Sequence, residues 1–264
     1  MHRAGSSSLP GSGPDHAHGS GGTVAGDTGG PCPRCRELRS TPLRPVRQSP
    51  FMDLRHWPLY GLRLRTPRLE LRLPGPELLD ELASVAAHGV HDPDRMPFSV
   101  AWTDGKPDEV ARAVFQHVLG TVAGWAVRDW TLSLAVLHEG EVVGRQDLMG
   151  RDFGVRRQVE TGSWLGLAHQ GQGLGTEMRA AALHLAFAGL GARYAVSAAM
   201  TDNRRSLGVS RRLGYADDGL DTDVVRGAPV TLRRLRLDRA GWEAHRSVDV
   251  SVAGLDACRA QFGV

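Results

Sequence analysis

The sequence predicts an α+β fold whose mixed, mostly antiparallel sheet has six to seven strands and is flanked by helices. Two observations carry this prediction. Strand-like and helix-like segments alternate from residue 68 to residue 245, and a hairpin and a further strand precede the main glycine-rich loop. A doubly wound parallel sheet would place such a loop in its first strand-loop-helix unit. The late position therefore favours a largely antiparallel sheet.

Composition divides the 264 residues into three parts. Residues 1–52 are rich in Gly, Pro, Ser and Arg, which predicts a disordered tail because little apolar surface is available for burial. Residues 53–248 are expected to form one domain, and residues 249–264 a C-terminal extension. The first 50 residues account for the net charge of +3, so the pI near 9.0 is a property of the tail and does not indicate a nucleic-acid partner.

Neither membrane nor metal binding is expected. No apolar run approaches the roughly 20 residues of a membrane span, and the N-terminus has no apolar signal region, which predicts a cytoplasmic protein. Cys32 and Cys35 have the CxxC spacing, but no second pair completes a zinc site. His88 and His91 lie near Asp92 and Asp94 in a predicted loop, where a structural or acceptor-pocket role is favoured over a metal site.

The first half of the domain follows from apolar periodicity and turn signals. Pro76 begins a predicted helix over 76–87, and a second helix is expected over 107–127. Between them, 93–103 reads as a loop. Strands are expected over 68–73, 131–137 and 141–148, the last two forming a hairpin around Glu139 and Gly140.

The second half continues the alternation. A longer strand is expected over 159–167, and a helix with one apolar face over 173–190. A helix over 203–213 should be capped by Asp202 or Asn203 and ended by Gly214. The remaining expected elements are strands over 194–199, 215–225 and 230–237 and a short helix over 238–245.

The glycine-rich loop between the long strand and its helix indicates a phosphate site. It consists of Gln170, Gly171, Gln172, Gly173, Leu174, Gly175 and Thr176. Glycine lets the backbone approach an anion, and the free N–H groups and dipole of the helix N-terminus attract it. The spacing is not the G-x-G-x-x-G of dinucleotide folds, which disfavours an NAD(P)-dependent oxidoreductase. Lys106, the only lysine, follows no glycine loop, so a Walker A motif is absent.

The chain resembles the GNAT superfamily of acyl-CoA N-acyltransferases, and within it the RimJ/RimL-like branch. Residues 170–175 fit the family's glycine motif, and Thr176-Glu177 fits a run typical of this branch. The blocks 202–206 and 212–215, the opening 64–69 and Trp242 resemble further family positions in the same order. Stretches such as 91–98 and 162–167 are in addition similar to mycobacterial members described as succinyltransferases.

The resemblance implies a fold and a donor. Acyl-CoA, as acetyl-CoA or succinyl-CoA and without a metal, would lie where the strands 159–167 and 194–199 splay apart. Its pyrophosphate would bind the N–H groups of residues 172–176. A backbone N–H near Leu165, Gly166 or Leu167 would stabilise the oxyanion.

Two residues are candidate catalysts by resemblance. Glu160, on the strand leading to the glycine loop, is the candidate base, with a solvent-facing strand residue as the alternative. Ser206 is the candidate acid for the departing thiolate, with a plain helix-surface hydroxyl as the alternative. Asn203 is expected to bind the pantetheine arm, to cap its helix, or both.

The acceptor side is less defined. Phe98, Trp102 and Trp125 are candidate lining residues, with core packing as the default alternative. If the donor is succinyl-CoA, Arg95 or Arg145 would meet its free carboxylate.

The resemblance therefore implies transfer of an acetyl or succinyl group from acyl-CoA to a primary amine by direct attack in a ternary complex. The acceptor would be a small-molecule amine or a protein N-terminus. The alternative is a non-catalytic acyl-CoA sensor on the same fold. An exposed sheet edge and the segment after Val248 favour a dimer or larger assembly.

Overall fold

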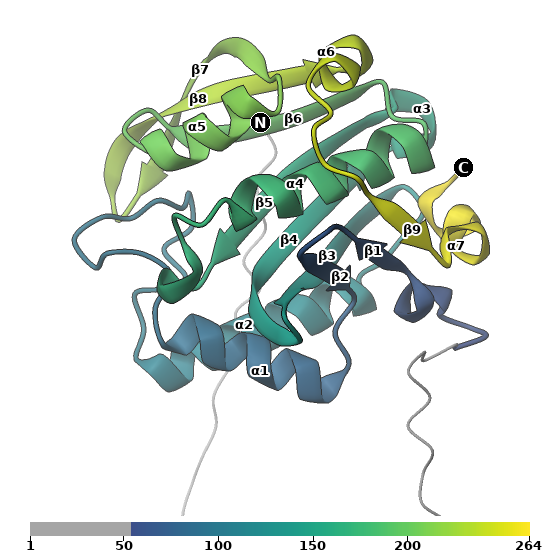
Figure 1. Ribbon diagram of the computed structural model, residues 1–264. Coiled ribbons are helices and arrows are strands. Elements are labelled where there is room, and N and C mark those ends of the chain that lie inside the picture. The colour runs from purple at the N-terminus through teal and green to yellow at the C-terminus, as the bar shows by residue number, and fades with distance from the viewer. Residues whose placement is uncertain (1–53) are drawn as a thin grey trace, which may run out of the picture. The chain divides into compact units, whose positions relative to one another are not determined.

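The computed structural model describes residues 54–264, which build one open sheet flanked by helices (Figure 1). The strand order is β7-β8-β6-β5-β4-β3-β2-β1-β9, and each neighbouring pair except β5 and β6 is antiparallel. The mixed, mostly antiparallel sheet is therefore confirmed, with nine strands in the described part instead of six to seven. The strands are β1 Arg63–Arg65, β2 Leu69–Arg72, β3 Asp129–His138, β4 Glu141–Arg151, β5 Gln158–Leu165, β6 Tyr194–Met200, β7 Ala216–Val225, β8 Ala228–Asp238 and β9 Ser251–Ala253.

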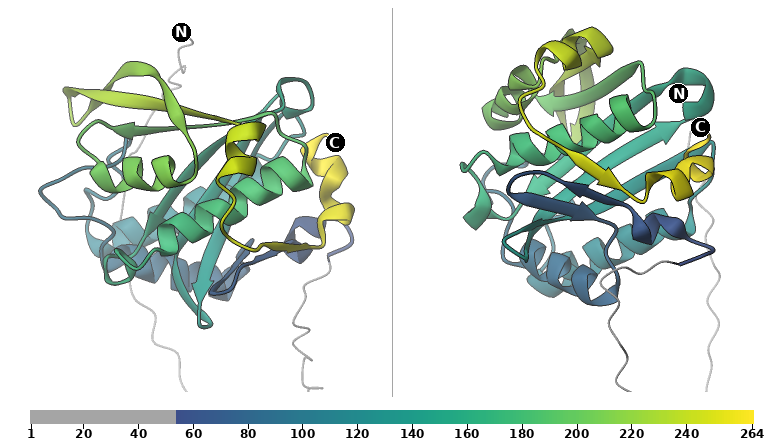
Figure 2. Two further views of the ribbon diagram at one scale, coloured as in Figure 1. Left: turned by 45° about the horizontal axis from the view of Figure 1, so that its top comes forward. Right: turned by 45° about the vertical axis from the view of Figure 1, so that its right-hand side comes forward.

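The additional strands lie at one edge of the sheet. β1 and β9 have three residues each, too few to show an alternating pattern in the sequence. They pair with each other, Arg63 opposite Ala253. β9 forms the outermost strand at this edge (Figure 2, right). Phe262 is fully buried, so residues 249–264 contribute to both the sheet and the core. The predicted N-terminal tail and its Cys32 and Cys35 lie outside the described residues.

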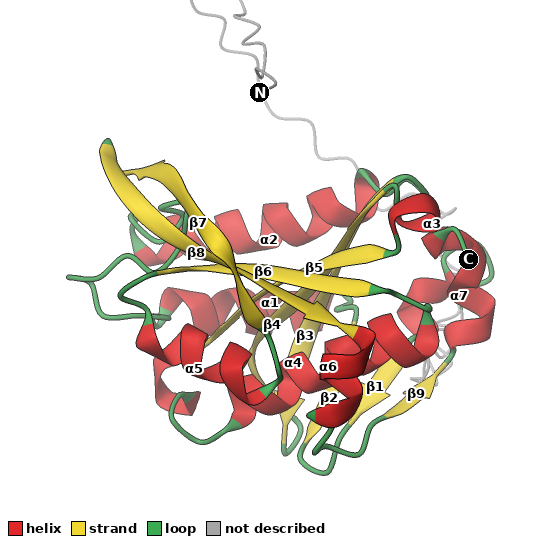
Figure 3. Cartoon of the chain, turned by 90° about the horizontal axis from the view of Figure 1, so that it is seen from above, coloured by secondary structure: helices red, strands yellow, loops and turns green. Residues whose placement is uncertain are grey.

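Helices cover both faces of the sheet. α1 and α2 lie on one face and α4, α5 and α6 on the other (Figure 3). α1 has the predicted bounds, whereas α2 ends earlier than predicted because Gly124 provides its C-cap. The helices are α1 Pro76–Ala87, α2 Pro107–Ala123, α3 Phe153–Arg156, α4 Leu174–His184, α5 Arg204–Arg212, α6 Arg239–Ala244 and α7 Leu255–Phe262.

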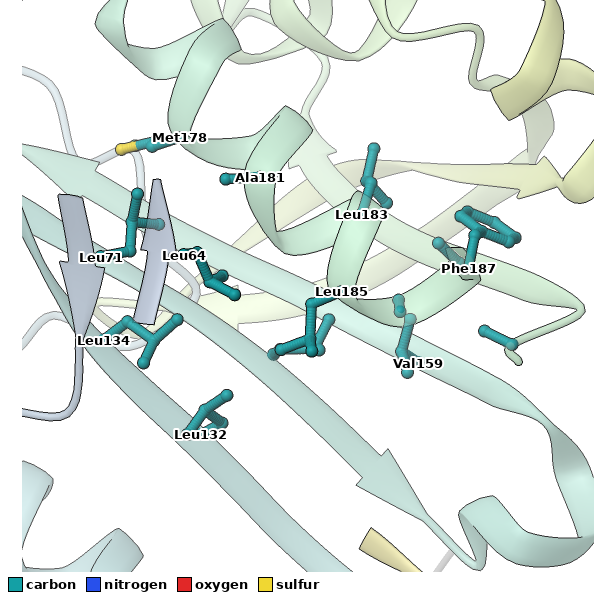
Figure 4. Close-up of a cluster of buried hydrophobic side chains, with 14 of the residues drawn as sticks. Leu64, Leu71, Leu132, Leu134, Val159, Met178, Ala181, Leu183, Leu185 and Phe187 are labelled. Carbon is teal, nitrogen blue, oxygen red and sulfur yellow. The ribbon is translucent and has the colours of Figure 1, made fainter. Parts of the chain in front are cut away.

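α4 forms the centre of the core. Its predicted apolar face is buried, and the helix continues as a π-helical segment, Leu185–Gly189, before the chain enters β6. Met178, Ala181 and Leu185 pack over strand residues such as Leu64 and Leu134 (Figure 4). This packing fixes the N-terminus of α4 relative to β5. Within residues 54–264, no helix is both long and apolar enough to cross a membrane.

β5 and β6 form a fork. Their parallel pairing is confined to residues 158–160 of β5 and 194–196 of β6. Beyond Glu160, β5 stays paired with β4 as far as Leu165, while β6 stays paired with β8 as far as Met200. The sheet is therefore open between the two strands beyond Glu160 and Val196, which we call the fork.

Candidate active site

The open side of β5 presents backbone groups to the fork. The N–H and C=O of one strand residue point the same way and alternate along the strand. The carbonyl of Thr161 accepts from Ser197 Oγ of β6 at 3.5 Å, and that of Gly162 accepts from Gln146 Nε2 of β4 at 3.0 Å. Ser163 and Leu165 therefore direct their backbone N–H groups toward the fork.

The other two predicted oxyanion donors are already engaged. β5 ends at Leu165, two residues before the predicted end. The N–H of Gly166 donates to Val143 O and that of Leu167 to Gly89 O, both at 3.0 Å. Of the three predicted residues, only Leu165 has its N–H directed toward the fork.

The glycine loop leads directly into α4. Gly173 is its N-cap with φ +82°, and Gly171 has φ +79°, a region in which glycine carries no steric cost. In the described part of the chain, the N–H groups of residues 171–175 donate to no backbone carbonyl. The N–H of Thr176 donates to Gly173 O at 3.1 Å, so it is not free as predicted. Five free donors at the positive end of a helix dipole are a combination that attracts anions.

A buried carboxylate holds the start of α4 against the β1–β2 turn. Glu177 accepts from Thr66 Oγ1 at 2.6 Å and from the Arg68 backbone N–H at 3.0 Å. It also forms an ion pair with the Arg68 guanidinium, with Nη2 at 2.6 Å from Oε2. Arg68 Nη1 reaches on to Gln172 O at 3.1 Å. One cation therefore lies beside the loop, and the loop is fixed from both sides.

Gln170 connects the loop to its surroundings. Its Nε2 donates to Val90 O at 2.7 Å and to Leu165 O at 2.9 Å. Its Oε1 accepts from Arg205 of α5 at 2.9 Å. The Gln170 side chain thus holds the end of β5, the loop after α1 and the start of α5 in one arrangement. Its contacts are those of a positioning residue.

α5 begins beside the fork. Asn203 caps it, with Oδ1 accepting from the Ser206 N–H at 3.1 Å, so the sequence correctly predicted Asn203 as one of two possible caps. Ser206 is half-buried, and its carbonyl accepts from Ser210 Oγ at 3.2 Å. Within residues 54–264 the Ser206 hydroxyl has no hydrogen-bond partner, so it is free to form a hydrogen bond.

Glu160 lies at the closed end of the fork. It is the last β5 residue in register with β6, opposite Val196, and it faces Met149 of β4 on the other side. Its side chain is exposed and lies on the same sheet face as Trp164, which packs beneath α1 and α2. Among the described residues the Glu160 carboxylate has no hydrogen bond or ion pair.

The loop between α1 and α2 is tied to two other parts of the molecule. Arg95 pairs with Asp202, ahead of α5, at 3.3 Å. Asp104 pairs with Arg226, in the β7–β8 turn, at 2.5 Å. His91 has both ring nitrogens in hydrogen bonds, to Asp92 O and to Thr103 Oγ1, each at 2.7 Å. These contacts hold the α1–α2 loop in place. Across residues 54–264, no group of three His, Cys, Asp or Glu residues could hold a metal ion.

The predicted acceptor aromatics separate into two groups. Phe98 contacts Trp102 with ring centroids 5.2 Å apart, and Trp102 contacts Trp164 of β5 at 5.8 Å. Trp125 instead stacks on Trp130 at 5.8 Å, and it contacts Phe262 of α7. Phe98 and Trp102 are half-buried beside the α1–α2 core cluster, so they combine core packing with partial exposure.

Both arginines suggested for an acyl carboxylate already have carboxylate partners. Arg95 pairs with Asp202, as above, and Arg145 pairs with the buried Asp147 at 2.9 Å. Asp147 also accepts from Ser133 Oγ at 2.6 Å. A ligand carboxylate would therefore have to displace or share an existing ion pair.

Sequence reasoning missed the residues that hold the site together. Glu177 was noted only within a motif, and Arg68 only within the opening strand. Thr66 and Arg68 lie more than a hundred residues from Glu177 in the chain, so no local pattern indicates their contact. The sequence signal at Glu177 is an acidic residue in the first turn of a helix, which by itself indicates only stabilisation by the helix dipole.

Solved structures of several acetyltransferases share this fold. Mycobacterium smegmatis RimJ, in complex with CoA-disulfide, superposes with a TM-score of 0.55 at 19% identity, covering 75% of this chain and 92% of that one. A putative acetyltransferase from T. thermophilus gives 0.57 at 21% identity, covering 69% and 92%. A GCN5-related N-acetyltransferase from Brucella melitensis gives 0.56 at 21% identity, covering 69% and 81%.

The sequence matches the same family directly. A family model described as an acetyltransferase (GNAT) domain matches residues 68–216, more than half of the chain. The match extends from the strand before α1 to the start of β7, and so includes the glycine loop, the fork and the α5 block. The chain therefore belongs to the GNAT acetyltransferase family.

Proposed function

We propose that the protein transfers an acyl group, acetyl or succinyl, from acyl-CoA to a primary amine by direct attack in a ternary complex. The acceptor is a small-molecule amine or a protein N-terminus. One observation carries the proposal. A fork with free strand N–H groups opens beside a helix N-terminus with five free donors. The fork binds the acyl-pantetheine arm, and the N-terminus of α4 binds the pyrophosphate.

The donor lies along the fork. Its pyrophosphate accepts from the N–H groups of residues 171–175, with the Arg68 guanidinium beside them. The pantetheine arm follows the open edge of β5, where no strand competes for hydrogen bonds. Asn203, at the start of α5, caps its helix and lines the path of the arm.

Three groups deprotonate the amine, stabilise the oxyanion and protonate the leaving sulfur. An ammonium has no lone pair, so Glu160 accepts the proton of the incoming amine, directly or through a water molecule. The amine nitrogen attacks the thioester carbon, and the N–H of Leu165 stabilises the resulting oxyanion. When the C–S bond breaks, Ser206 supplies a proton to the departing sulfur. The exposure of Glu160 gives an amine access to it from the α1–α2 side.

Activity with a panel of amines tests this function. CoA release from acetyl-CoA and succinyl-CoA is measured for the wild type, Glu160→Gln and Ser206→Ala. Loss of a general base costs about 10²–10⁴-fold in rate, and we expect a kcat loss in this range for Glu160→Gln with unchanged acyl-CoA affinity. Glu141→Gln, an exposed β4 carboxylate, is the matched control.

The outcomes separate the alternatives. Binding of acyl-CoA without turnover across a broad panel would favour the sensor function. Full activity of Glu160→Gln would remove Glu160 as the base. Thermal stabilisation by acetyl-CoA alone would exclude the succinyl donor. Mass spectrometry of acyl-CoA that co-purifies with the protein identifies the acyl group independently.

A further inference from the structure

A buried arginine beside the fork has no carboxylate partner. Arg179 of α4 is 6% exposed and donates from Nη1 to Ser210 Oγ at 2.9 Å and from Nη2 to Ser163 Oγ at 3.2 Å. Its Nε is buried without a partner, and no Asp or Glu of residues 54–264 pairs with it. A guanidinium stays protonated, and an isolated buried charge is costly. An anion at this place would offset that cost.

The groups around Arg179 are polar and neutral. Tyr215 and Thr161 share a hydrogen bond at 3.3 Å, and Ser197 of β6 donates to the Thr161 carbonyl. Ser210, which accepts from Arg179, adds a further neutral hydroxyl. The positive charge of Arg179 is therefore not neutralised by its surroundings.

Ser163 connects this charge to the fork. It is half-buried and lies on the part of β5 that is not paired with β6. At about 3.3 Å per residue, it is roughly 10 Å from the closed end at Glu160. Its Oγ accepts from Arg179, and its own O–H has no partner in the described part of the chain. Ser163 thus presents a free donor, polarised by a cation behind it.

We propose that the Ser163 hydroxyl binds the CoA sulfur as it leaves as a thiolate, with Arg179 as the positioning residue behind it. This inference rests on the proposed function. The C–N bond forms, and the nitrogen loses its second proton to Glu160, which has already passed the first proton to solvent. The C–S bond then breaks with its electron pair on sulfur. Ser163 and Arg179 hold the thiolate charge until Ser206 delivers a proton, which Ser206 regains from water.

Comparing CoA with desulfo-CoA, in which hydrogen replaces the thiol, isolates the sulfur. Isothermal titration of the full chain at pH 6.5 and pH 8.5 gives the affinity ratio of the two ligands. With the reference pKa of a cysteine thiol, about 8.5, a thiol pKa that is lower by about one in the complex corresponds to a roughly tenfold gain in thiolate affinity over the thiol. Between pH 6.5 and pH 8.5 we expect the preference for CoA to rise about fivefold in the wild type, because the free thiol is only about half ionised at pH 8.5.

The variants separate this role from a purely structural one. Ser163→Ala and Arg179→Met should abolish the pH dependence while changing desulfo-CoA affinity less than threefold. Ser163→Thr, which keeps the hydroxyl, should restore it. Arg156→Met, an exposed arginine of α3, is the control and should behave as the wild type. If Arg179→Met does not fold, the comparison of Ser163→Ala with Ser163→Thr tests the proposal on its own.

Two results would overturn the inference. A wild-type preference that is the same at both pH values, or a Ser163→Ala variant that keeps the wild-type rise, would remove the thiolate role and leave the acyl-CoA function intact. A wild type that binds neither ligand would overturn both proposals.

Discussion

At the scale of single residues, Glu177 connects the start of α4 to the β1–β2 turn. Burial by itself raises the pKa of this carboxyl, but hydrogen bonds from Thr66 and Arg68 outweigh it and hold the pKa below its ordinary value. A depressed folded-state pKa means that the carboxylate stabilises the fold above the unfolded pKa near 4.5. This stabilisation is lost as pH falls through the folded value.

Glu177→Gln tests this role. The variant keeps the shape but loses the charge, and hydrogen bonds to charged groups contribute about 1.5–3 kcal/mol. We expect urea unfolding to show a loss of this order at pH 7 that shrinks toward pH 3. Glu243→Gln, an exposed carboxylate of α6, should change stability by less than about 0.5 kcal/mol. A loss that is equal at both pH values would show that the charge is not the cause.

At the scale of elements, the start of α4 depends on glycine. Gly173 must adopt φ +82° to turn the chain so that the first-turn N–H groups face outward. A Cβ at this position would lie 3.4 Å from Arg68 Nη2, an ordinary van der Waals contact. The positive φ, and not a lack of space, therefore selects glycine here.

Gly173→Ala is expected to lose about 1–2 kcal/mol of stability, the cost of a left-handed conformation for an L-residue. The variant should also bind acyl-CoA more weakly, because relief of the backbone strain would rotate the N–H groups of residues 171–175 away from the pyrophosphate. Thermal unfolding with and without acetyl-CoA measures both effects. Gly208→Ala, inside α5 with open space around it, should be neutral or slightly stabilising. Unchanged acyl-CoA affinity in Gly173→Ala would argue against the loop as the pyrophosphate site.

The elements that the sequence predicts well carry their own signals. α1 has Pro76 at its start, and the β3–β4 hairpin has Glu139 and Gly140, both with positive φ, at its turn. β1, β9 and α7 were missed because each is short and forms through contacts with distant parts of the chain. The glycine loop could be predicted because its glycines, like Pro76 at the start of α1, are a local signal in the sequence. The contacts of Glu177 with Thr66 and Arg68 could not be predicted, because these partners are remote in sequence.

At the scale of the whole molecule, the C-terminal segment stabilises the edge of the sheet. Phe262 is fully buried, with its ring centroid 4.9 Å from that of Trp130 and 5.4 Å from that of Trp125. Trp125 also donates from Nε1 to Gln261 O at 3.0 Å. α7 therefore packs into the main core, against β3 and the segment after α2.

Phe262→Ala is expected to destabilise the protein by about 3–5 kcal/mol, the range for removing a buried aromatic side chain. Denaturant unfolding measures the loss. Val155→Ala, at an 88% exposed position of α3, should have almost no effect. A small effect of Phe262→Ala would argue against a contribution of residues 249–264 to the stability of the core.

The pairing of β1 with β9 has a consequence for synthesis on the ribosome. Arg63 is translated early, but its partner Ala253 emerges only after α4, the fork and the β7–β8 hairpin. Until then the nascent chain exposes an unpaired strand edge at β1, which is a template for association with other chains. Folding of this edge is therefore expected to be completed late, and a chaperone that covers a strand edge would act during that interval.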